Sequence, residues 1–253
     1  MRTLIYHDIA PQHERDEVGF PGPLAARYKL DPRDFEAHLD ALAASRVRVG
    51  DATTGAPDAQ VSLSFDDGGA SALRAAEALE RRGWKGMFFL TTGRLDTRGF
   101  LSFDGARELA RRGHVVGSHS HSHPTYMGKL SREELDREWV QSRELLAEAL
   151  GAPPAAAAVP GGYVSREVVR SAAAAGYEVL FTSEPTARIQ HRELLVRGRY
   201  TIWATTPPSV AAAYARGAPL ARWRLWLEWN AKKLAKSASP AAYQLLRHVR
   251  ARL

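Results

Sequence analysis

Short apolar runs alternate along this chain with longer stretches of helical spacing. The apolar runs are typical of buried strands and lie at residues 3–7, 61–67, 87–92, 114–120, 155–162 and 178–183. The longer stretches have an apolar residue every three or four positions and lie at residues 32–44, 70–82, 103–112, 131–150 and 165–175. Strands that alternate with helices predict an α/β fold built on a parallel sheet, either open or closed into a barrel.

Local signals support the ends of these helices. A glycine follows four of them, at Gly83, Gly113, Gly151 and Gly176. Glycine favours the left-handed backbone that ends a helix. Ser131 followed by Glu134 is a capping-box pattern at the start of the longest predicted helix.

Polar residues gather where three of the predicted strands end. Asp66 and Asp67 form the polar end of the second run, residues 118–123 begin at the end of the fourth, and residues 161–162 end the fifth. The carboxyl ends of parallel strands meet at one rim, where α/β folds assemble their sites. We therefore expect these residues to form a single functional site.

Each polar cluster has two interpretations when it is taken alone. His119 and His123 could bind one divalent metal ion, or they could belong to a histidine-rich surface loop. Asp66 and Asp67 could bind a cation between them, or one of them could cap the helix that begins near Ala70. Together, two histidines and one carboxylate make a metal site with open positions, and a second carboxylate beside it can accept a proton. The pair of clusters predicts a metal-assisted hydrolase.

The same motifs carry a family resemblance. SFDDG followed by SHSHSHP, together with the YHDI opening and AAGYEVLFTSEP, resembles the NodB-homology polysaccharide deacetylases of carbohydrate esterase family 4. The resemblance implies a deformed (β/α) barrel, here over residues 1–213. It also implies Asp66 as general base, with Asp67, His119 and His123 as ligands of Zn²⁺, or of Co²⁺ or Ni²⁺.

The resemblance departs from the family pattern at two places. The stretch that aligns with the family's third motif gives Gly161 the position of a backbone donor to the oxyanion, but Ala158 replaces the motif arginine. Arg197 or Arg199 could supply that charge, or both could be solvated surface residues. The family's late histidine motif is not visible, so His191 and His7 are both candidates for the general acid.

The net charge of +7 is concentrated at the C-terminus. Residues 214–253 contain nine Lys or Arg and one acidic residue, which leaves about −1 for residues 1–213. The basic charge is thus a property of the tail. The chain has no cysteine, which excludes disulfides and thiolate chemistry.

The tail has the pattern of an amphipathic helix over residues 220–236, and a second basic helix is predicted over 241–253. Its apolar positions lie on one helical face: Leu220, Trp223, Leu227, Ala231 and Leu234, with Trp226 at the border. That face could pack on the barrel, or residues 220–253 could dock on an anionic membrane. Nucleic acid is disfavoured as a partner because no binding motif accompanies the charge.

The combined expectation is a hydrolase that removes an acyl group, acetyl by resemblance, from an N-acylated amino sugar in a glycan or a lipid-linked precursor. With no signal peptide and no membrane span in the sequence, we expect a cytoplasmic protein, peripheral on the inner face of the membrane. Two alternatives remain at this stage. One is a catalytically impaired sugar-binding protein of the same fold, and the other is a membrane adaptor that acts through the tail.

Overall fold

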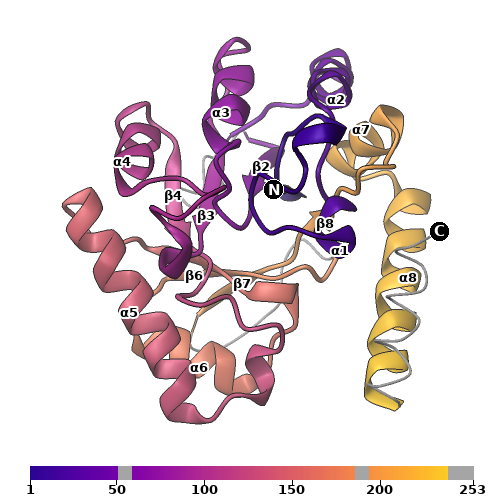
Figure 1. Cartoon of the computed structure of the whole chain (residues 1–253). Coiled ribbons are helices and arrows are strands. Elements are labelled where there is room, and N and C mark those ends of the chain that lie inside the picture. The colour runs from indigo at the N-terminus through magenta and orange to yellow at the C-terminus, as the bar shows by residue number, and fades with distance from the viewer. Residues whose placement is uncertain (51–58, 186–193, 239–253) are drawn as a thin grey trace.

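A computed structural model describes residues 1–50, 59–185 and 194–238 and contains one curled, wholly parallel sheet (Figure 1). The strand order is β7-β6-β5-β4-β3-β2-β1-β8. The strands are β1 (Arg2–Tyr6), β2 (Val61–Phe65), β3 (Met87–Leu90), β4 (Val115–Ser118), β5 (Ala156–Ala158), β6 (Val179–Phe181), β7 (Leu195–Arg197) and β8 (Tyr200–Thr201). The predicted parallel α/β fold is confirmed, and the sheet has the form of a deformed barrel.

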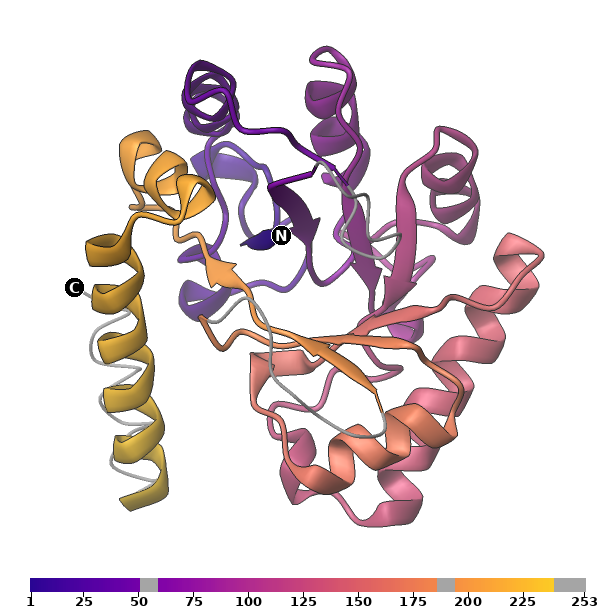
Figure 2. The same cartoon turned by 180° about the vertical axis from the view of Figure 1, so that it is seen from behind.

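Helices surround the outside of the curled sheet (Figures 1 and 2). The α-helices are α1 (Pro23–Ala26), α2 (Pro32–Ala44), α3 (Ala72–Glu80), α4 (Phe103–Arg111), α5 (Arg132–Leu150), α6 (Arg166–Ala174), α7 (Pro208–Arg216) and α8 (Pro219–Ala238). Short 3-10 turns lie at η1 (Gln12–Glu14), η2 (Thr92–Arg94), η3 (Met127–Lys129) and η4 (Pro160–Gly162). All six predicted strands and the five predicted barrel helices are present, with ends that move by a few residues.

Burial on both faces explains why the strands read as continuous apolar runs. Every residue of β2 and β3 is buried, as expected for parallel strands with helices on one side and packed side chains on the other. Stacked rings join neighbouring strands in the core, with Phe65 lying 4.8 Å from Phe88 between ring centroids. The predicted capping box is confirmed, because Ser131 accepts from the Glu134 backbone N–H and Glu134 accepts from the Ser131 N–H.

A single extended run closes the barrel. Strand β7 pairs with β6 and β8 pairs with β1, so the two edges of the sheet order are joined by only Gly198 and Arg199. Residues 195–201 were not among the six predicted strands, although a neighbouring strand was the expected carrier of Arg197 or Arg199. Arg199 therefore lies at the seam of the barrel, with its side chain fully buried.

The helix predicted over residues 220–236 is present as α8, which extends along one side of the barrel (Figures 1 and 2). The predicted division after residue 213 falls inside α7, which ends at the left-handed Gly217. The second helix predicted over 241–253 lies outside the described residues. Among the described residues, no helix is both long enough and apolar enough to cross a membrane.

Candidate functional site

Asp66 and Asp67 follow β2 directly and lie at the carboxyl rim of the barrel. The Asp66 backbone N–H donates to the Tyr6 carbonyl at 3.0 Å, which continues the β1–β2 ladder by one residue. Asp67 adopts a left-handed backbone conformation, with φ of 76°. Such a conformation is strained for a non-glycine residue and turns the chain sharply, so the two carboxylates leave the strand in different directions.

His119 and His123 bring their imidazoles to Asp67 from the loop after β4. His119 Nε2 lies 3.5 Å from Asp67 Oδ1, and His123 Nε2 lies 3.3 Å from the same oxygen. Ser120 and His123 both have positive φ, near 60°, and this double turn returns His123 to the rim beside His119. The structure therefore brings the predicted residues together, with ligand atoms within 4.8 Å of one another.

The arrangement fits a divalent metal ion in its donor chemistry and in its support. One carboxylate oxygen and two imidazole nitrogens converge, a donor set suited to zinc and similar ions. The other ring nitrogen of His119, Nδ1, lies 2.9 Å from the Ala158 carbonyl oxygen. A hydrogen bond from Nδ1 to that carbonyl leaves Nε2 free to bind metal, the usual outer support of a metal-binding histidine.

Electrostatics favours the protonation states that a metal requires at His119 and Asp67, whereas at His123 burial is outweighed by the hydrogen bond and charge of Asp67, which raise the imidazole pKa. Burial lowers the pKa of His119 to about 4, so its imidazole is neutral near pH 7. Burial alone would raise the pKa of Asp67, but the hydrogen bond from His123 and the nearby histidine charges hold that pKa below its ordinary value. The set therefore offers a neutral imidazole and an anionic carboxylate.

Arg199 forms a bidentate ion pair with Asp66. Arg199 Nη1 donates to Asp66 Oδ1 at 2.6 Å, and Nη2 donates to Oδ2 at 2.8 Å. The guanidinium also donates to Ser64 Oγ at 3.0 Å and to the Thr182 carbonyl at 3.2 Å. Burial raises the pKa of Asp66, but the Arg199 charge and hydrogen bonds outweigh burial and keep this pKa below its ordinary value. Between the two predicted arginines, the structure places Arg199 on Asp66.

Gly161 lies in the turn after β5, beside the strand that carries His119. Its φ is 66°, and a Cβ at this position would come within 3.2 Å of the Thr125 carbonyl oxygen. Both facts explain a glycine here. Ala158, which stands in the place of the family's arginine, contributes its carbonyl to His119.

His7 follows β1 and reaches the same rim. Its ring lies 4.6 Å from the Tyr28 ring, and its charge is one of the influences that lower the pKa of Asp67. His7 Nδ1 is buried, and no hydrogen-bond partner for it is found in the described part of the chain. His191, the other candidate for the general acid, lies outside the described residues.

Glu138 is a supporting residue that the sequence analysis missed. From α5, its Oε2 accepts the backbone N–H groups of His121 and Ser122 at 2.9 and 2.8 Å. His121 Nδ1 itself lies 3.0 Å from Thr92 Oγ1, so it belongs to the loop's own packing. A lone glutamate on a helix gave no sequence signal, because its partners are backbone groups that come from another element.

A buried ammonium fixes a second loop against the metal site. Lys29 Nζ donates to the carbonyls of Arg15 and Phe20 at 2.6 and 2.7 Å and also to that of Val18. It lies 3.8 Å from Asp8 Oδ2, and both side chains are nearly inaccessible. The loop it shapes places the Phe20 ring 4.7 Å from the His123 ring.

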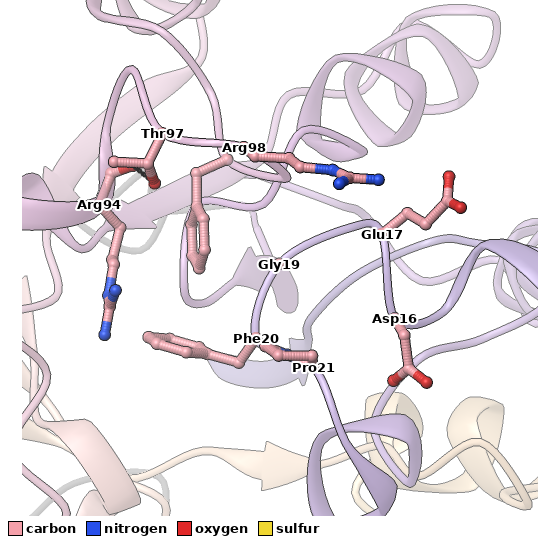
Figure 3. A pocket seen from close by; sticks show the side chains of 9 residues that line it. Asp16, Glu17, Gly19, Phe20, Pro21, Arg94, Thr97 and Arg98 are labelled. Carbon is pink, nitrogen blue, oxygen red and sulfur yellow. Dashed lines mark hydrogen bonds between the residues drawn. The ribbon is translucent and has the colours of Figure 1, made fainter.

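A cavity of about 600 Å³ opens beside Phe20 (Figure 3). Figure 3 shows Arg94 at one end and Asp16 and Glu17 at the other. The lining residues are Asp16, Glu17, Gly19, Phe20, Pro21, Arg94, Thr97, Arg98 and Phe100. Because Phe20 also contacts His123, this cavity borders the metal-binding set.

Comparisons with known proteins agree with this geometry. The family model for polysaccharide deacetylase matches residues 53–180, half of the chain. A search of curated proteins found no match.

Solved structures share the fold at low sequence identity. A polysaccharide deacetylase from Bacillus cereus superposes with a TM-score of 0.69 at 22% identity, covering 85% of this chain and 68% of that one. The Streptococcus pyogenes deacetylase PplD in complex with acetate superposes with a TM-score of 0.68 at 19% identity, covering 82% of this chain and 94% of that one. IcaB from Ammonifex degensii superposes with a TM-score of 0.67 at 23% identity, covering 85% of this chain and 96% of that one.

Proposed function

Because this chain belongs to the polysaccharide deacetylase family, an amide-hydrolase family that acts on carbohydrates, we propose that it removes the N-acetyl group of an amino sugar in a metal-dependent reaction. The observation that carries this proposal is the convergence of Asp67, His119 and His123 beside a separate, arginine-held carboxylate. The cavity beside Phe20 gives room for the part of the glycan next to the acetylated sugar.

We assign the metal to Asp67 Oδ1, His119 Nε2 and His123 Nε2, with Zn²⁺ preferred and Co²⁺ or Ni²⁺ as alternatives. When bound there, a divalent ion polarises the amide carbonyl and lowers the pKa of water. Three protein ligands suit such chemistry, because they leave positions open for water and substrate.

Asp66 is the proposed general base. It takes a proton from the attacking water, and the oxygen of that water forms the new bond to the acyl carbon. Arg199 keeps Asp66 ionised and fixes both carboxylate oxygens, so the base is ready and oriented before substrate arrives. This arrangement replaces the arginine that the family carries at the position of Ala158.

The remaining steps concern the oxyanion and the departing amine. We propose that the Gly161 backbone N–H donates to the oxyanion, a role that needs no side chain. The C–N bond then breaks and the nitrogen accepts a proton, which gives a free amine and acetate. His7 is the described residue best placed to provide that proton, since it lies at the rim and its charge acts on both Asp66 and Asp67.

A protein that only binds sugar is the weaker interpretation. Burying Asp66 and Arg199 together has a desolvation cost, which their mutual contacts must offset. Sugar binding alone gives no reason to hold an ionised carboxylate next to a metal-ligand set. A hydrolase that uses Asp66 as a base does give one.

The direct test measures bound metal and amine release in the same preparations. Asp66→Asn should bind metal like the parent and release amine from N-acetylated oligosaccharides or lipid-linked amino sugars at least 100-fold more slowly. Asp104→Asn is the matched control, since Asp104 is exposed on α4, and it should keep full activity. A metal-loaded parent that releases no amine, or an Asp66→Asn variant of near-parent activity, would contradict the assignment.

We also propose that the amino sugar is carried on a lipid and that the protein acts at the inner face of the membrane. The support is the basic charge of residues 214–253 and the tryptophans of α8. The cytoplasmic location stays a prediction from the sequence.

A further inference from the structure

Helix α8 has an inner side that is already occupied by contacts with the rest of the protein. Leu225 is buried in the main hydrophobic core. Arg222 Nε donates to the Tyr200 hydroxyl at 3.1 Å, and the Trp229 ring stacks on Tyr163, with centroids 5.5 Å apart and planes 21° apart. These contacts attach α8 to β8 and to the turn after β5.

The opposite side of α8 carries large apolar side chains that remain exposed. Leu220 is 72% exposed, Trp223 58%, Trp226 43% and Leu227 40%. At about 100° per residue, Leu220, Trp223 and Leu227 lie on the side of the helix away from Leu225 and Trp229, and Trp226 lies at the border between the two sides. Packing of the apolar face on the barrel was one of its two interpretations. At Leu220, Trp223 and Leu227 the face remains exposed, and the inner side of α8 contacts the barrel instead.

Such a stripe is uncommon on a folded protein. Across the described residues, the only other large hydrophobic side chain that is exposed is Val140 on α5. Two tryptophans on one helix, in a region of net positive charge, match a lipid interface, where indole rings lie among the headgroups and basic residues meet lipid phosphates.

We propose that the outer side of α8 docks on an anionic phospholipid surface, while its inner side fixes the orientation of the active-site rim relative to that surface. Tyr163, the partner of Trp229, directly follows Gly161 and Gly162. Docking through α8 therefore holds the turn with the assigned oxyanion donor at a set position above the lipid. This second part rests on the proposed deacetylase activity, whereas the docking itself does not.

The orientation has a consequence for the substrate. A sugar carried on a membrane lipid is presented at a fixed height and is reached only by a rim held at that height. A soluble glycan has no such requirement. The geometry therefore favours an amphiphilic, lipid-borne amino sugar over a free polysaccharide.

Binding of the full-length protein to vesicles tests the docking surface. The parent should co-sediment with vesicles of phosphatidylcholine and phosphatidylglycerol, bind much less to phosphatidylcholine alone, and dissociate as salt rises. Trp223→Ser with Trp226→Ser should weaken binding at least tenfold, since both positions lose large apolar area. Val140→Ser on α5 is the control and should bind like the parent.

Three results would overturn the docking proposal. One is a parent that does not bind anionic vesicles, and another is a tryptophan double variant that binds as tightly as the parent. The third is a parent that forms dimers in solution which the double variant does not form, because the stripe would then be covered by a second copy of the chain.

Activity measurements separate docking from catalysis. With a lipid-borne substrate in vesicles, the double variant should lose at least tenfold in rate, yet keep parent activity on a soluble N-acetylated oligosaccharide. Trp229→Leu should still bind vesicles but lose the higher rate on the vesicle-borne substrate relative to the soluble one, because the rim is no longer fixed to α8. If that difference in rate is unchanged, the orienting role of α8 is wrong. Vesicle binding without any amine release would refute the proposed deacetylase activity and leave the docking proposal standing.

Discussion

Replacing Arg199 with methionine removes the one positive charge that, among the described residues, is fixed on Asp66 by hydrogen bonds, and it leaves a similar volume at the barrel seam. The lost contacts are two short hydrogen bonds to Asp66, at 2.6 and 2.8 Å, and one each to Ser64 and Thr182. Arg199 is fully buried and the Asp66 side chain is 5% exposed. The variant therefore leaves a buried carboxylate without its partner.

Breaking a buried ion pair from one side costs about 3–5 kcal/mol of unfolding free energy. For a domain of this size that corresponds to a fall in Tm of roughly 6–20 °C. With the base no longer held, kcat/KM should fall about 100-fold. The pKa of Asp66 should rise, because burial then acts unopposed by Arg199, so the acid side of the pH–rate profile should move to higher pH.

The assays are thermal unfolding and steady-state amine release across pH. Arg199→Lys should be intermediate, since lysine keeps the charge but cannot make two parallel hydrogen bonds. Arg197→Met controls for the loss of an arginine from the same run and should leave the pH profile unchanged. If Arg199→Met keeps the parent Tm and a kcat/KM within about threefold of the parent, the assigned role of the seam arginine is wrong.

Three further predictions address the rest of the molecule. A chelator should abolish amine release. It should also lower Tm by roughly 5–11 °C relative to protein that is saturated with metal at 100 times its Kd. Unchanged Tm and activity would exclude a resident metal. Lys29→Met should lower the free energy of unfolding by about 3–5 kcal/mol, and adding Asp8→Asn should recover part of that loss. The variant should also have a lower kcat/KM, because the Phe20 loop is no longer held. A Lys29→Met variant as stable as the parent would refute this. Hydrogen bonds from Arg112 lower the pKa of Glu80 to about 2 from 4.5, so Glu80 stabilises the fold above pH 4.5 and this contribution fades toward pH 2. Glu80→Gln should flatten stability across that pH window in denaturant titrations, and parallel curves for parent and variant would contradict the linkage.

The sequence predicted the fold well where one strand and one helix alternate. Strand β3 is uniformly apolar, β2 is apolar at every second position, and α5 begins at a complete capping box, so local signals and global fold agree. The run from β7 to β8 was not among the six predicted strands, because arginine is polar and only the tertiary structure buries Arg199. Burial of Arg199 depends on Asp66, and no local pattern reports that partnership.

The same limit applies to the site. Asp67, His119 and His123 have a spacing that carries chemistry, and the structure brings them together as expected. Glu138 and Lys29 act on backbone carbonyls and amides from other elements, so their identities alone gave no signal. Such supporting contacts follow from topology and become visible only when the chain is folded.

The barrel seam sets an order of events during protein synthesis. Arg199 leaves the ribosome 133 residues after Asp66, its partner, which at about 5–20 residues per second is a delay of roughly 7–27 s. Until then the nascent chain has strands β1 to β7 but lacks both β8, which pairs with β1, and the cation that neutralises Asp66. The half-made barrel therefore carries an open sheet edge and an unpaired buried acid. A pause or truncation before residue 199 should leave a chain that chaperones bind, whereas synthesis of residues 199–201 supplies the partner of Asp66 and the strand that pairs with β1 together.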